Sequence, residues 1–493
     1  MLKDVLGALA VAHPLKQAIR CGDLMLTYEE LFIMKDRVKK YLTEELRIQK
    51  GDKIALYLPN CADFIYSFFS AAEIGAVTIP LNTNFKENEL RYYTSKCGIK
   101  TIITHSDLLV RWGQMPLKEK TLTFVLMDQL EWLTADIKAD SLLKSSPISP
   151  DAETIDSDIL YLCTSGSSGR PKIIPKTPAL LFAGAENLGS ALDVNSQDRF
   201  LCVTPFFHAN GFENCMFLPI MKGASLVLMR EFSPRSMLDV LEQEEITVLI
   251  GSPFIFSSLC DCADRSYEFS AMRYCLSAGA SLPAKLKKNF YDTFGIKVRE
   301  HYGASETGPI SVQFEDADEI GAVGKPLNNV GVRILDKEGR QLPPEVTGEV
   351  FVSSTSMIKG YLDEPELSSE AFPGGYFKTG DFGMLDSEGN LHIVGRNKAI
   401  INSAGIKIDP AEIRNTLLLY PKVKDAYVTG VKNRRGMEII KAIIVAHPDC
   451  TAKEIVTFCR DRLAAFKIPR HIEFIETIPV DVMGKVIRSL VEE

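Results

Sequence analysis

The sequence has 493 residues, of which 46% are hydrophobic and 24% are charged, and its formal net charge is -8 at pH 7. This composition excludes disordered and fibrous proteins, and the length exceeds what one ordinary core fills, so we expect at least two domains. Acidic and basic residues are interspersed and form no basic face, which argues against nucleic acid as a partner. No apolar run approaches the ~18 residues of a membrane span, so an integral membrane protein is not expected.

The cysteines indicate the compartment. Eleven of them are scattered through the chain without a CxxC pair. The two that stand nearest, Cys260 and Cys262, do not have the spacing of the usual zinc motifs. In residues 1–20, Asp4 precedes a short apolar stretch that His13 and Pro14 interrupt, a pattern unlike that of a signal peptide. Unpaired cysteines and this beginning predict a cytoplasmic protein.

The chain as far as about residue 250 alternates short apolar strands with segments of helical periodicity. Thr27 and Glu30 have capping-box spacing at the start of one such helix, and Pro59 follows a strand. This alternation predicts an α/β fold with a mainly parallel sheet. The expected strands lie at 53–58, 77–80, 101–104, 123–127, 159–163, 201–204, 225–229 and 247–250, and the expected helices at 27–46 and 62–74.

The pattern changes at about residue 320, where short strands and Gly/Pro turns predict a β-rich subdomain. After Gly395-Arg396 a compact α+β module is expected, with a helix opened by the capping-box pair Thr451 and Glu454. The expected strands of these two parts lie at 330–335, 348–353, 391–394, 423–431 and 439–445.

A loop rich in serine and glycine follows the strand predicted at 159–163. Its sequence is Thr164-Ser165-Gly166-Ser167-Ser168-Gly169-Arg170-Pro171-Lys172. Two glycines let the backbone curl and turn several N–H groups toward one point, and the hydroxyls and Lys172 suit polyphosphate oxygens. The spacing differs from the GxxxxGK[ST] loop, and Pro171 argues against a helix that starts at the lysine. An ordinary flexible linker is the alternative interpretation.

This loop resembles the phosphate-binding signature of the adenylate-forming superfamily, which comprises acyl-CoA synthetases, aryl-CoA ligases, nonribosomal-peptide adenylation domains and insect luciferases. Further motifs of that superfamily follow in the same order over nearly the whole chain. Each is weak alone, but the ordered set is highly specific. The motifs are Pro205-Phe206-Phe207-His208, Tyr302-Gly303-Ala304-Ser305-Glu306-Thr307, Thr379-Gly380-Asp381, Gly395-Arg396, Ser403-Ala404-Gly405, Lys467-Ile468-Pro469, and Gly484-Lys485 with Arg488.

The resemblance implies a large N-terminal α/β domain at residues 1–397, with a β-barrel-like part at about 320–397, and a small mobile C-terminal α+β lid at 398–493. It also implies a site for ATP and Mg²⁺. Tyr302 would stack on the adenine, with the small residues Gly279-Ala280-Ser281 on the other face of the ring. Ser305 would bond the α-phosphate, and Glu306 would bind Mg²⁺, which prefers hard oxygen ligands.

Asp381 and Arg396 would hold the ribose hydroxyls, as a carboxylate does in dinucleotide sites. Lys485 would bridge the substrate carboxylate and the α-phosphate. Lys398 matches the hinge of the lid, and Gly405 the segment that meets the thiol. Ordinary surface turns and solvated lysines are the alternative interpretation of these positions. The implied nucleotide-binding set is Thr164, Ser165, Gly166, Ser167, Ser168, Gly169, Lys172, Gly279, Ala280, Ser281, Tyr302, Gly303, Ser305, Asp381 and Arg396.

The chemistry implied is activation of a carboxylic acid as its acyl-adenylate, which requires two anions to meet at the α-phosphate. His208 matches the Pro-x-Phe-His signature of fatty- and aryl-acyl-CoA synthetases, where an aromatic ring can gate the carboxylate site; a structural histidine is the alternative. Amino-acid-activating relatives carry an aspartate just downstream. Residues 209–215 contain none, although Glu213 is present, so a fatty or aryl acid fits better than an amino acid.

The leading hypothesis is therefore an acyl-CoA synthetase that uses ATP, Mg²⁺ and coenzyme A. A stand-alone enzyme that loads the phosphopantetheine of a carrier protein is the main alternative, and a luciferase-like oxygenase is a third. A non-catalytic nucleotide-binding module would predict damaged catalytic positions. Glu306, Asp381, Arg396 and Lys485 are all intact.

Overall fold

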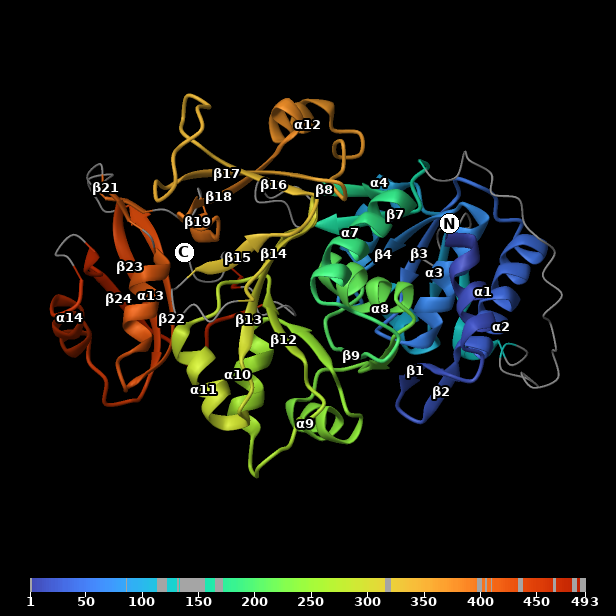
Figure 1. Ribbon diagram of the computed structural model, residues 1–493, viewed down its shortest axis with the longest axis horizontal. Coiled ribbons are helices and arrows are strands. Elements are labelled where there is room, and N and C mark those ends of the chain that lie inside the picture. The colour runs from blue at the N-terminus through green and yellow to red at the C-terminus, as the bar shows by residue number, and fades with distance from the viewer. Residues whose placement is uncertain are drawn as a thin grey trace.

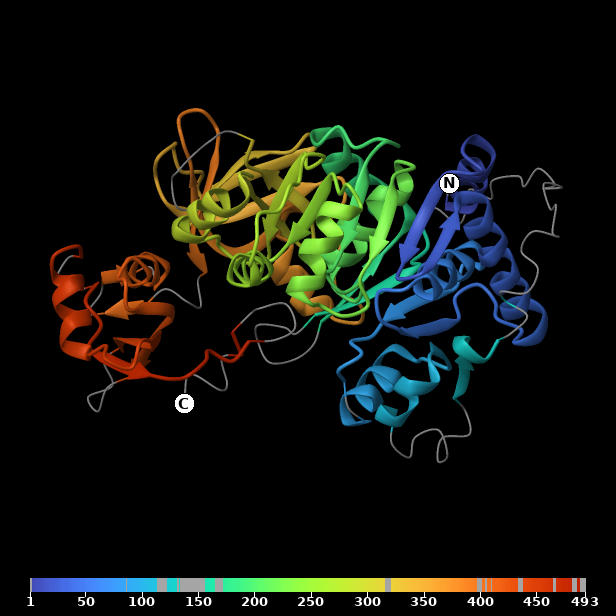
Figure 2. The same ribbon diagram turned by 90° about the horizontal axis from the view of Figure 1, so that it is seen from below.

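The computed structural model contains two large sheets with helices around them, and a small C-terminal group of elements. In Figures 1 and 2 this small group, coloured orange to red, lies at one end of the molecule, and α1 (Leu2–Ala12) and α2 (Tyr28–Lys40) lie at the other. The structure describes residues 2–85, 87–112, 122–130, 133, 156–164, 172–314, 321–396, 401–403, 406–408, 410–432, 438–463, 467–480 and 486–487.

The first sheet has six strands in the order β6-β5-β3-β4-β7-β8. Its pairs are parallel except for the antiparallel hairpin of β7 and β8. Near-continuous burial of β3, β4 and β5 explains their apolar sequences. The strands are β3 (Lys53–Tyr57), β4 (Val77–Pro80), β5 (Thr101–Thr104), β6 (Thr123–Leu126), β7 (Leu160–Thr164) and β8 (Lys172–Lys176).

The second sheet has 13 strands, and its parallel centre is the series β13-β12-β11-β9-β10-β1. Strands of the predicted β-rich part join this sheet through β14 and β15. The strands are β1 (Gln17–Cys21), β2 (Leu24–Thr27), β9 (Arg199–Cys202), β10 (Ser225–Leu228), β11 (Val248–Gly251), β12 (Tyr274–Ala278), β13 (Val298–Ala304), β14 (Gly308–Val312), β15 (Ala322–Pro326), β16 (Val330–Leu335), β17 (Gly348–Ser354), β18 (Phe377–Leu385) and β19 (Leu391–Arg396).

Helices cover both faces of each sheet, so the body is layered. Leu201 of β9 packs among α9, α10 and α11, whereas Phe200 on the same strand packs toward α3 and α7. In β3, Ile54 faces the α3 side and Ala55 faces α4. Helix α3 therefore lies between the two sheets. These helices are α3 (Ala62–Ile74), α4 (Glu87–Cys97), α7 (Pro178–Ala191), α9 (Pro234–Gln243), α10 (Pro253–Cys262) and α11 (Ala284–Phe294).

Several shorter helical segments complete the larger body. The π-helical segment η6 leads into α8 beside the large sheet, and η1 extends α2. The predicted capping box of Thr27 and Glu30 is confirmed at the start of α2. The segments are η1 (Tyr41–Glu45), η2 (Ser106–Trp112), η3 (Met127–Gln129), η6 (Asn210–Phe217), α8 (Leu218–Met221), α12 (Pro365–Ala371) and η7 (Pro373–Gly375).

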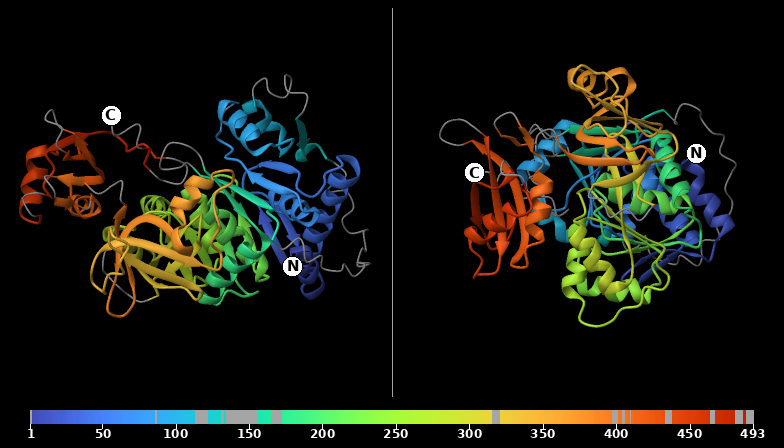
Figure 3. Two further views of the ribbon diagram at one scale, coloured as in Figure 1. Left: turned by 90° about the horizontal axis from the view of Figure 1, so that it is seen from above. Right: turned by 60° about the vertical axis from the view of Figure 1, so that its left-hand side comes forward.

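The C-terminal group has its own core, as the α+β prediction requires. The capping box of Thr451 and Glu454 is confirmed at the start of α14. Lys285 of α11 donates to the carbonyl oxygen of Leu418 at 2.9 Å and joins this group to the larger body. Figure 3 shows the same group, in orange to red, from two further directions. Among the described residues, no helix combines the length and apolar character needed to cross a membrane. The elements are β20 (Ile401–Ser403), β21 (Ile406–Ile408), α13 (Pro410–Leu418), β22 (Val423–Lys432), β23 (Glu438–Ala446), α14 (Ala452–Arg460) and β24 (His471–Phe474).

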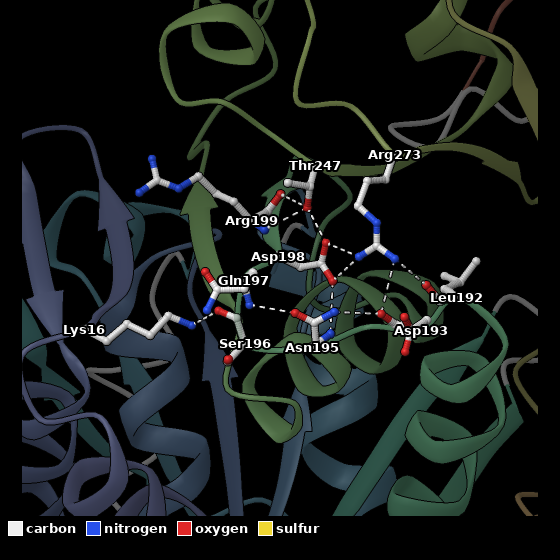
Figure 4. A network of polar contacts seen from close by, with 10 residues as sticks. All are labelled: Lys16, Leu192, Asp193, Asn195, Ser196, Gln197, Asp198, Arg199, Thr247 and Arg273. Carbon is white, nitrogen blue, oxygen red and sulfur yellow. Dashed lines mark hydrogen bonds and ion pairs between the residues drawn. The ribbon is translucent and has the colours of Figure 1, made fainter.

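A buried carboxylate ties together the amino ends of three parallel strands (Figure 4). Asp198, which precedes β9, is 2% exposed. Both of its oxygens lie 2.7 Å from Nη1 of Arg273, which precedes β12. Thr247, which precedes β11, donates to Asp198 Oδ1 at 2.7 Å, and the backbone N–H of Asn195 donates to Oδ2 at 3.0 Å. Active sites of open α/β sheets lie at the carboxyl ends of strands, so this network is structural.

We expect Asp198→Ala to lower the free energy of unfolding by about 3 kcal/mol, because Arg273 and Thr247 lose a buried partner. Chemical denaturation followed by fluorescence measures the change. Asp292→Ala is the matched control: it breaks the ion pair with Lys288 on the surface of α11, and its cost should stay below about 1 kcal/mol. Equal stability of the two variants would contradict the structural role of Asp198.

Candidate active site

The β13–β14 hairpin carries four of the predicted site residues. Tyr302 and Gly303 belong to β13, which runs to Ala304, and Ser305 and Glu306 form the turn to β14. The strand is longer than its apolar part, because the pairing with β14 continues across an irregularity between Tyr302 and Gly303. A Cβ at Gly303 would stand 3.0 Å from the carbonyl oxygen of Gly308, so glycine permits this close approach. One hairpin therefore positions the aromatic ring and the carboxylate.

Asp381 of β18 lies beside the ring that the sequence assigns to adenine. The Tyr302 hydroxyl donates to Asp381 Oδ2 at 2.6 Å, and Asp381 is 6% exposed. The backbone N–H of Asp381 donates to Thr379 Oγ1 at 3.0 Å, which orders the turn ahead of it. Arg396 pairs with Asp381 across β18 and β19, and its side chain lies outside the described residues. The predicted ribose and adenine contacts are thus brought together.

A tyrosine that the sequence analysis did not single out links the loop lysine to the predicted metal ligand. Lys172 Nζ donates to the Tyr361 hydroxyl at 3.2 Å and lies 4.5 Å from the centre of its ring. Tyr361 in turn donates to Glu306 Oε1 at 2.8 Å. Burial, followed by the charge of Glu306, raises the pKa of Tyr361, so its hydroxyl remains a donor. The only hint of this role in the sequence is a tyrosine next to Gly360. A buried tyrosine hydroxyl usually needs a hydrogen-bond partner, but the sequence does not say which one.

The predicted phosphate loop closes a β-hairpin. Thr164 ends β7 and pairs with Lys172, which begins β8. A strand, and not a helix, therefore starts at the lysine, which confirms the prediction from Pro171. The residues between them, Ser165, Gly166, Ser167, Ser168 and Gly169 among them, lie outside the described residues.

The small residues predicted for the other face of the adenine follow β12. Gly279, Ala280 and Ser281 are exposed, and Gly279 has a φ of 85°, which favours glycine. Strand β12 is parallel to β13, and Ala278 stands opposite His301. Residues 279–281 and Tyr302 therefore lie at the same end of two neighbouring parallel strands.

His208 stands between β9 and η6, and its side chain is half-buried. Its ring lies 4.4 Å from that of Phe207, centre to centre. Downstream, Glu213 is 4% exposed and lies 3.1 Å from Nζ of the fully buried Lys176. Burial raises the pKa of Glu213 and Lys176 opposes this change. Lys176 is therefore the charge partner of Glu213 inside the protein.

Besides the residues of the phosphate loop, three more predicted residues lie outside the described part of the chain: Lys485, Lys398 and Gly405. Their roles rest on the sequence alone. Glu306 fits the predicted magnesium ligand, because among the described residues its second oxygen accepts no hydrogen bond. A hard oxygen with a free lone pair suits Mg²⁺.

One other group in the described part of the chain has metal-type side chains: Cys61, Asp63 and His105. Arg230 Nη2 lies 3.1 Å from His105 Nδ1, and His105 Nε2 lies 3.0 Å from Asp63 Oδ2. Because an arginine can only donate, Nδ1 accepts and Nε2 carries the proton toward Asp63. Both ring nitrogens are thus engaged, and the group connects the two sheets as a polar link.

Tyr361→Phe is expected to raise the Mg²⁺ concentration that the reaction requires, because the carboxylate of Glu306 loses the donor that orients it. Losses of about 10–100-fold in metal affinity are usual for such outer partners. A Mg²⁺ titration of pyrophosphate release measures the change. Tyr291→Phe, on the exposed face of α11, is the control. An unchanged magnesium requirement would remove Tyr361 from the site.

A layered α/β body with a hydroxyl-rich sequence before Lys172, an aromatic ring beside the carboxylate of Asp381, and a second carboxylate in the β13–β14 turn is typical of a nucleotide-binding enzyme. The family model described as "AMP-binding enzyme" matches residues 8–362, and "AMP-binding enzyme C-terminal domain" matches residues 412–485. The chain therefore belongs to the AMP-binding enzyme family.

Characterised relatives extend this comparison over almost the entire chain. A feruloyl-CoA synthase of Amycolatopsis is 30% identical over 486 residues, 97% of this chain and 95% of the relative. A long-chain-fatty-acid–CoA ligase of Mycobacterium tuberculosis is 30% identical over 483 residues, 96% and 93% of the two chains. ATP-bound MatB of Rhodopseudomonas palustris superposes with a TM-score of 0.89 at 25% sequence identity, and the match covers 100% of this chain and 98% of MatB. O-succinylbenzoate coenzyme A synthetase of Bacillus subtilis was solved with ATP and magnesium ion. It superposes with a TM-score of 0.86 at 26% sequence identity, and the match covers 99% of this chain and 99% of that chain.

Proposed function

We propose that this protein activates a carboxylic acid with ATP, forming an acyl-adenylate and pyrophosphate, and then transfers the acyl group to the thiol of coenzyme A. The observation that carries this proposal is the β13–β14 hairpin. It holds Tyr302 against Asp381, and it holds Glu306 against Tyr361, which also contacts Lys172. This arrangement would combine the base, ribose and phosphate contacts of one nucleotide.

In the first step a carboxylate oxygen of the acid attacks the α-phosphorus, and the bond to pyrophosphate breaks. Lys172 donates to the phosphates from the end of the loop, and Asp381 accepts from the ribose hydroxyls. Glu306 would hold Mg²⁺, which would supply positive charge at the phosphate oxygens. Lys485 reduces the repulsion between the two anions as they meet. In the second step the thiol sulfur attacks the acyl carbon, and AMP leaves.

Coenzyme A is favoured as the acceptor over the phosphopantetheine of a carrier protein, because the relatives described above are named as CoA ligases. We place the domain boundary near residue 397, so that residues 398–493 form the lid. A cytoplasmic location is supported by the eleven cysteines, all of which are free thiols.

Pyrophosphate release across a panel of fatty and aryl acids tests the proposal, with coenzyme A, carrier-bound phosphopantetheine or no thiol present. We expect acid-dependent release without thiol and thioester formation with coenzyme A. Faster transfer to the carrier protein would favour the alternative acceptor. Absence of release with every acid would contradict the proposal.

Free α-amino acids are expected to be poor substrates, because Lys176 already neutralises Glu213, the acidic residue downstream of His208. ATP–pyrophosphate exchange measures this with matched pairs such as phenylalanine and 3-phenylpropanoate. The acid without the amino group should exchange at least 10-fold faster, since a desolvated ammonium without a partner costs several kcal/mol. Faster exchange with the amino acid would overturn the expectation.

A further inference from the structure

A chain of polar side chains connects β13 to the start of η6. His301 Nδ1 lies 3.1 Å from the carbonyl oxygen of Ser311, and His301 Nε2 lies 3.3 Å from Nδ2 of Asn214. The same Asn214 nitrogen donates to Asn210 Oδ1 at 2.9 Å. His301 and Asn214 are 5% and 6% exposed, whereas Asn210 is half-buried. The chain therefore begins in the core and ends at an accessible amide.

The contact between His301 and the carbonyl oxygen of Ser311 determines which atoms donate and which accept along this chain of hydrogen bonds. A carbonyl oxygen can only accept, so His301 Nδ1 carries the proton. Burial lowers the pKa of His301 to about 4, which keeps the ring neutral and makes Nε2 an acceptor. Asn214 must then present its NH₂ group to both partners, and Asn210 must accept with Oδ1. The group that Asn210 leaves open is Nδ2, which can only donate.

Asn210 lies where the acyl group is expected. It follows His208 by two residues, and the chain that holds it ends at His301, the neighbour of Tyr302. His301 stands opposite Ala278, which precedes the small residues of the adenine wall. Asn210 Nδ2 donates to no atom in the described part of the chain. Asn214 Oδ1 is buried and has no hydrogen-bond partner among the described residues. A bound ligand with an acceptor atom would satisfy Nδ2 of the half-buried Asn210.

Resting on the proposed function, we propose that Asn210 is a specificity residue that selects carboxylic acids whose tail carries a neutral oxygen acceptor, such as a hydroxyl, ether or carbonyl group. A purely aliphatic tail would leave the amide donor of Asn210 unsatisfied once water is expelled. A second charged group on the tail of the acid would find no partner in Glu213 or Lys176, because these two buried residues already form an ion pair with each other.

Matched acids that differ by one oxygen test this selectivity: cinnamate with 4-hydroxycinnamate and 4-methoxycinnamate, and hexanoate with 6-hydroxyhexanoate. The readout is the ratio of kcat/KM within each series, measured by pyrophosphate release. We expect the wild type to prefer the oxygenated acid roughly 10-fold in at least one series. Asn210→Leu should bring that ratio to one or below, while the acid without the extra oxygen keeps its rate. Asn289→Leu, exposed on α11, is the control and should change no ratio.

Asn210→Asp keeps the shape of the side chain and replaces the donor by an acceptor. It should lose the preference for the methoxy acid and keep that for the hydroxy acid, which can donate to the carboxylate. Wild-type ratios of one in every series, or ratios that the Asn210 variants leave unchanged, would overturn the inference while leaving acid activation intact. Failure of the proposed function would instead abolish pyrophosphate release with all of these acids.

Discussion

Replacing Lys485 with alanine is expected to slow acyl-adenylate formation by about 10²–10³-fold, the usual loss when a charge-stabilising donor is removed. The same variant, supplied with pre-formed acyl-adenylate and coenzyme A, should still form thioester at a nearly normal rate. The reason is that, in the proposed mechanism, the lysine reduces the repulsion between two anions only while the carboxylate approaches the α-phosphate. ATP–pyrophosphate exchange measures the first half-reaction, and thioester formation measures the second. Lys453→Ala, on the exposed face of α14, is the control within the same domain.

Lys398→Pro should produce the opposite defect. Proline fixes φ near −65°, which hinders rotation of the lid at its hinge but leaves the adenylating arrangement accessible. Adenylation should then survive while thioester formation falls. Lys398→Ala separates loss of the side chain from loss of backbone freedom and should resemble the wild type. Equal loss of both half-reactions in Lys485→Ala and Lys398→Pro would contradict alternation of the lid.

Local signals predicted local structure well. The helix expected at 62–74 is α3 (Ala62–Ile74), and the strands expected at 77–80 and 101–104 have these bounds as well. Their information lies in a few neighbouring residues: a continuous apolar stretch, a proline or glycine at the end, a capping box at the start. The π-helical geometry of η6 has no such signal, and the sequence did not indicate it.

Contacts between distant segments were the part that the sequence did not reveal. Tyr361 meets Lys172 and Glu306, which lie 189 and 55 positions away along the chain. Lys176 and Glu213 form their ion pair only because β8 and η6 pack together. Such contacts depend on how layers stack, and the periodicity of one segment contains no information about them. Motif order predicted which residues would belong to the site, and the fold was required to show their partners.

Asp381→Ala is expected to weaken ATP binding about 10–100-fold, because a carboxylate contributes more to a hydrogen bond than a neutral group does. Both half-reactions should slow, since AMP keeps the ribose that Asp381 is expected to hold through both steps. Isothermal titration calorimetry with ATP measures the affinity, and thermal unfolding checks that the variant remains folded. Unchanged ATP affinity would remove Asp381 from the site.

The hydrogen bond between Tyr302 and Asp381 leads to a second prediction for ATP binding. At 2.6 Å the tyrosine hydroxyl occupies the carboxylate that the ribose is expected to use, so the nucleotide must share or displace it. Tyr302→Phe removes this competitor and keeps the ring that stacks on the adenine. It should therefore bind ATP at least as tightly as the wild type, whereas Tyr302→Ala, which also lacks the ring, should bind it more weakly. A loss in Tyr302→Phe as large as that in Asp381→Ala would show that the tyrosine hydroxyl supports the bound nucleotide instead of competing with it.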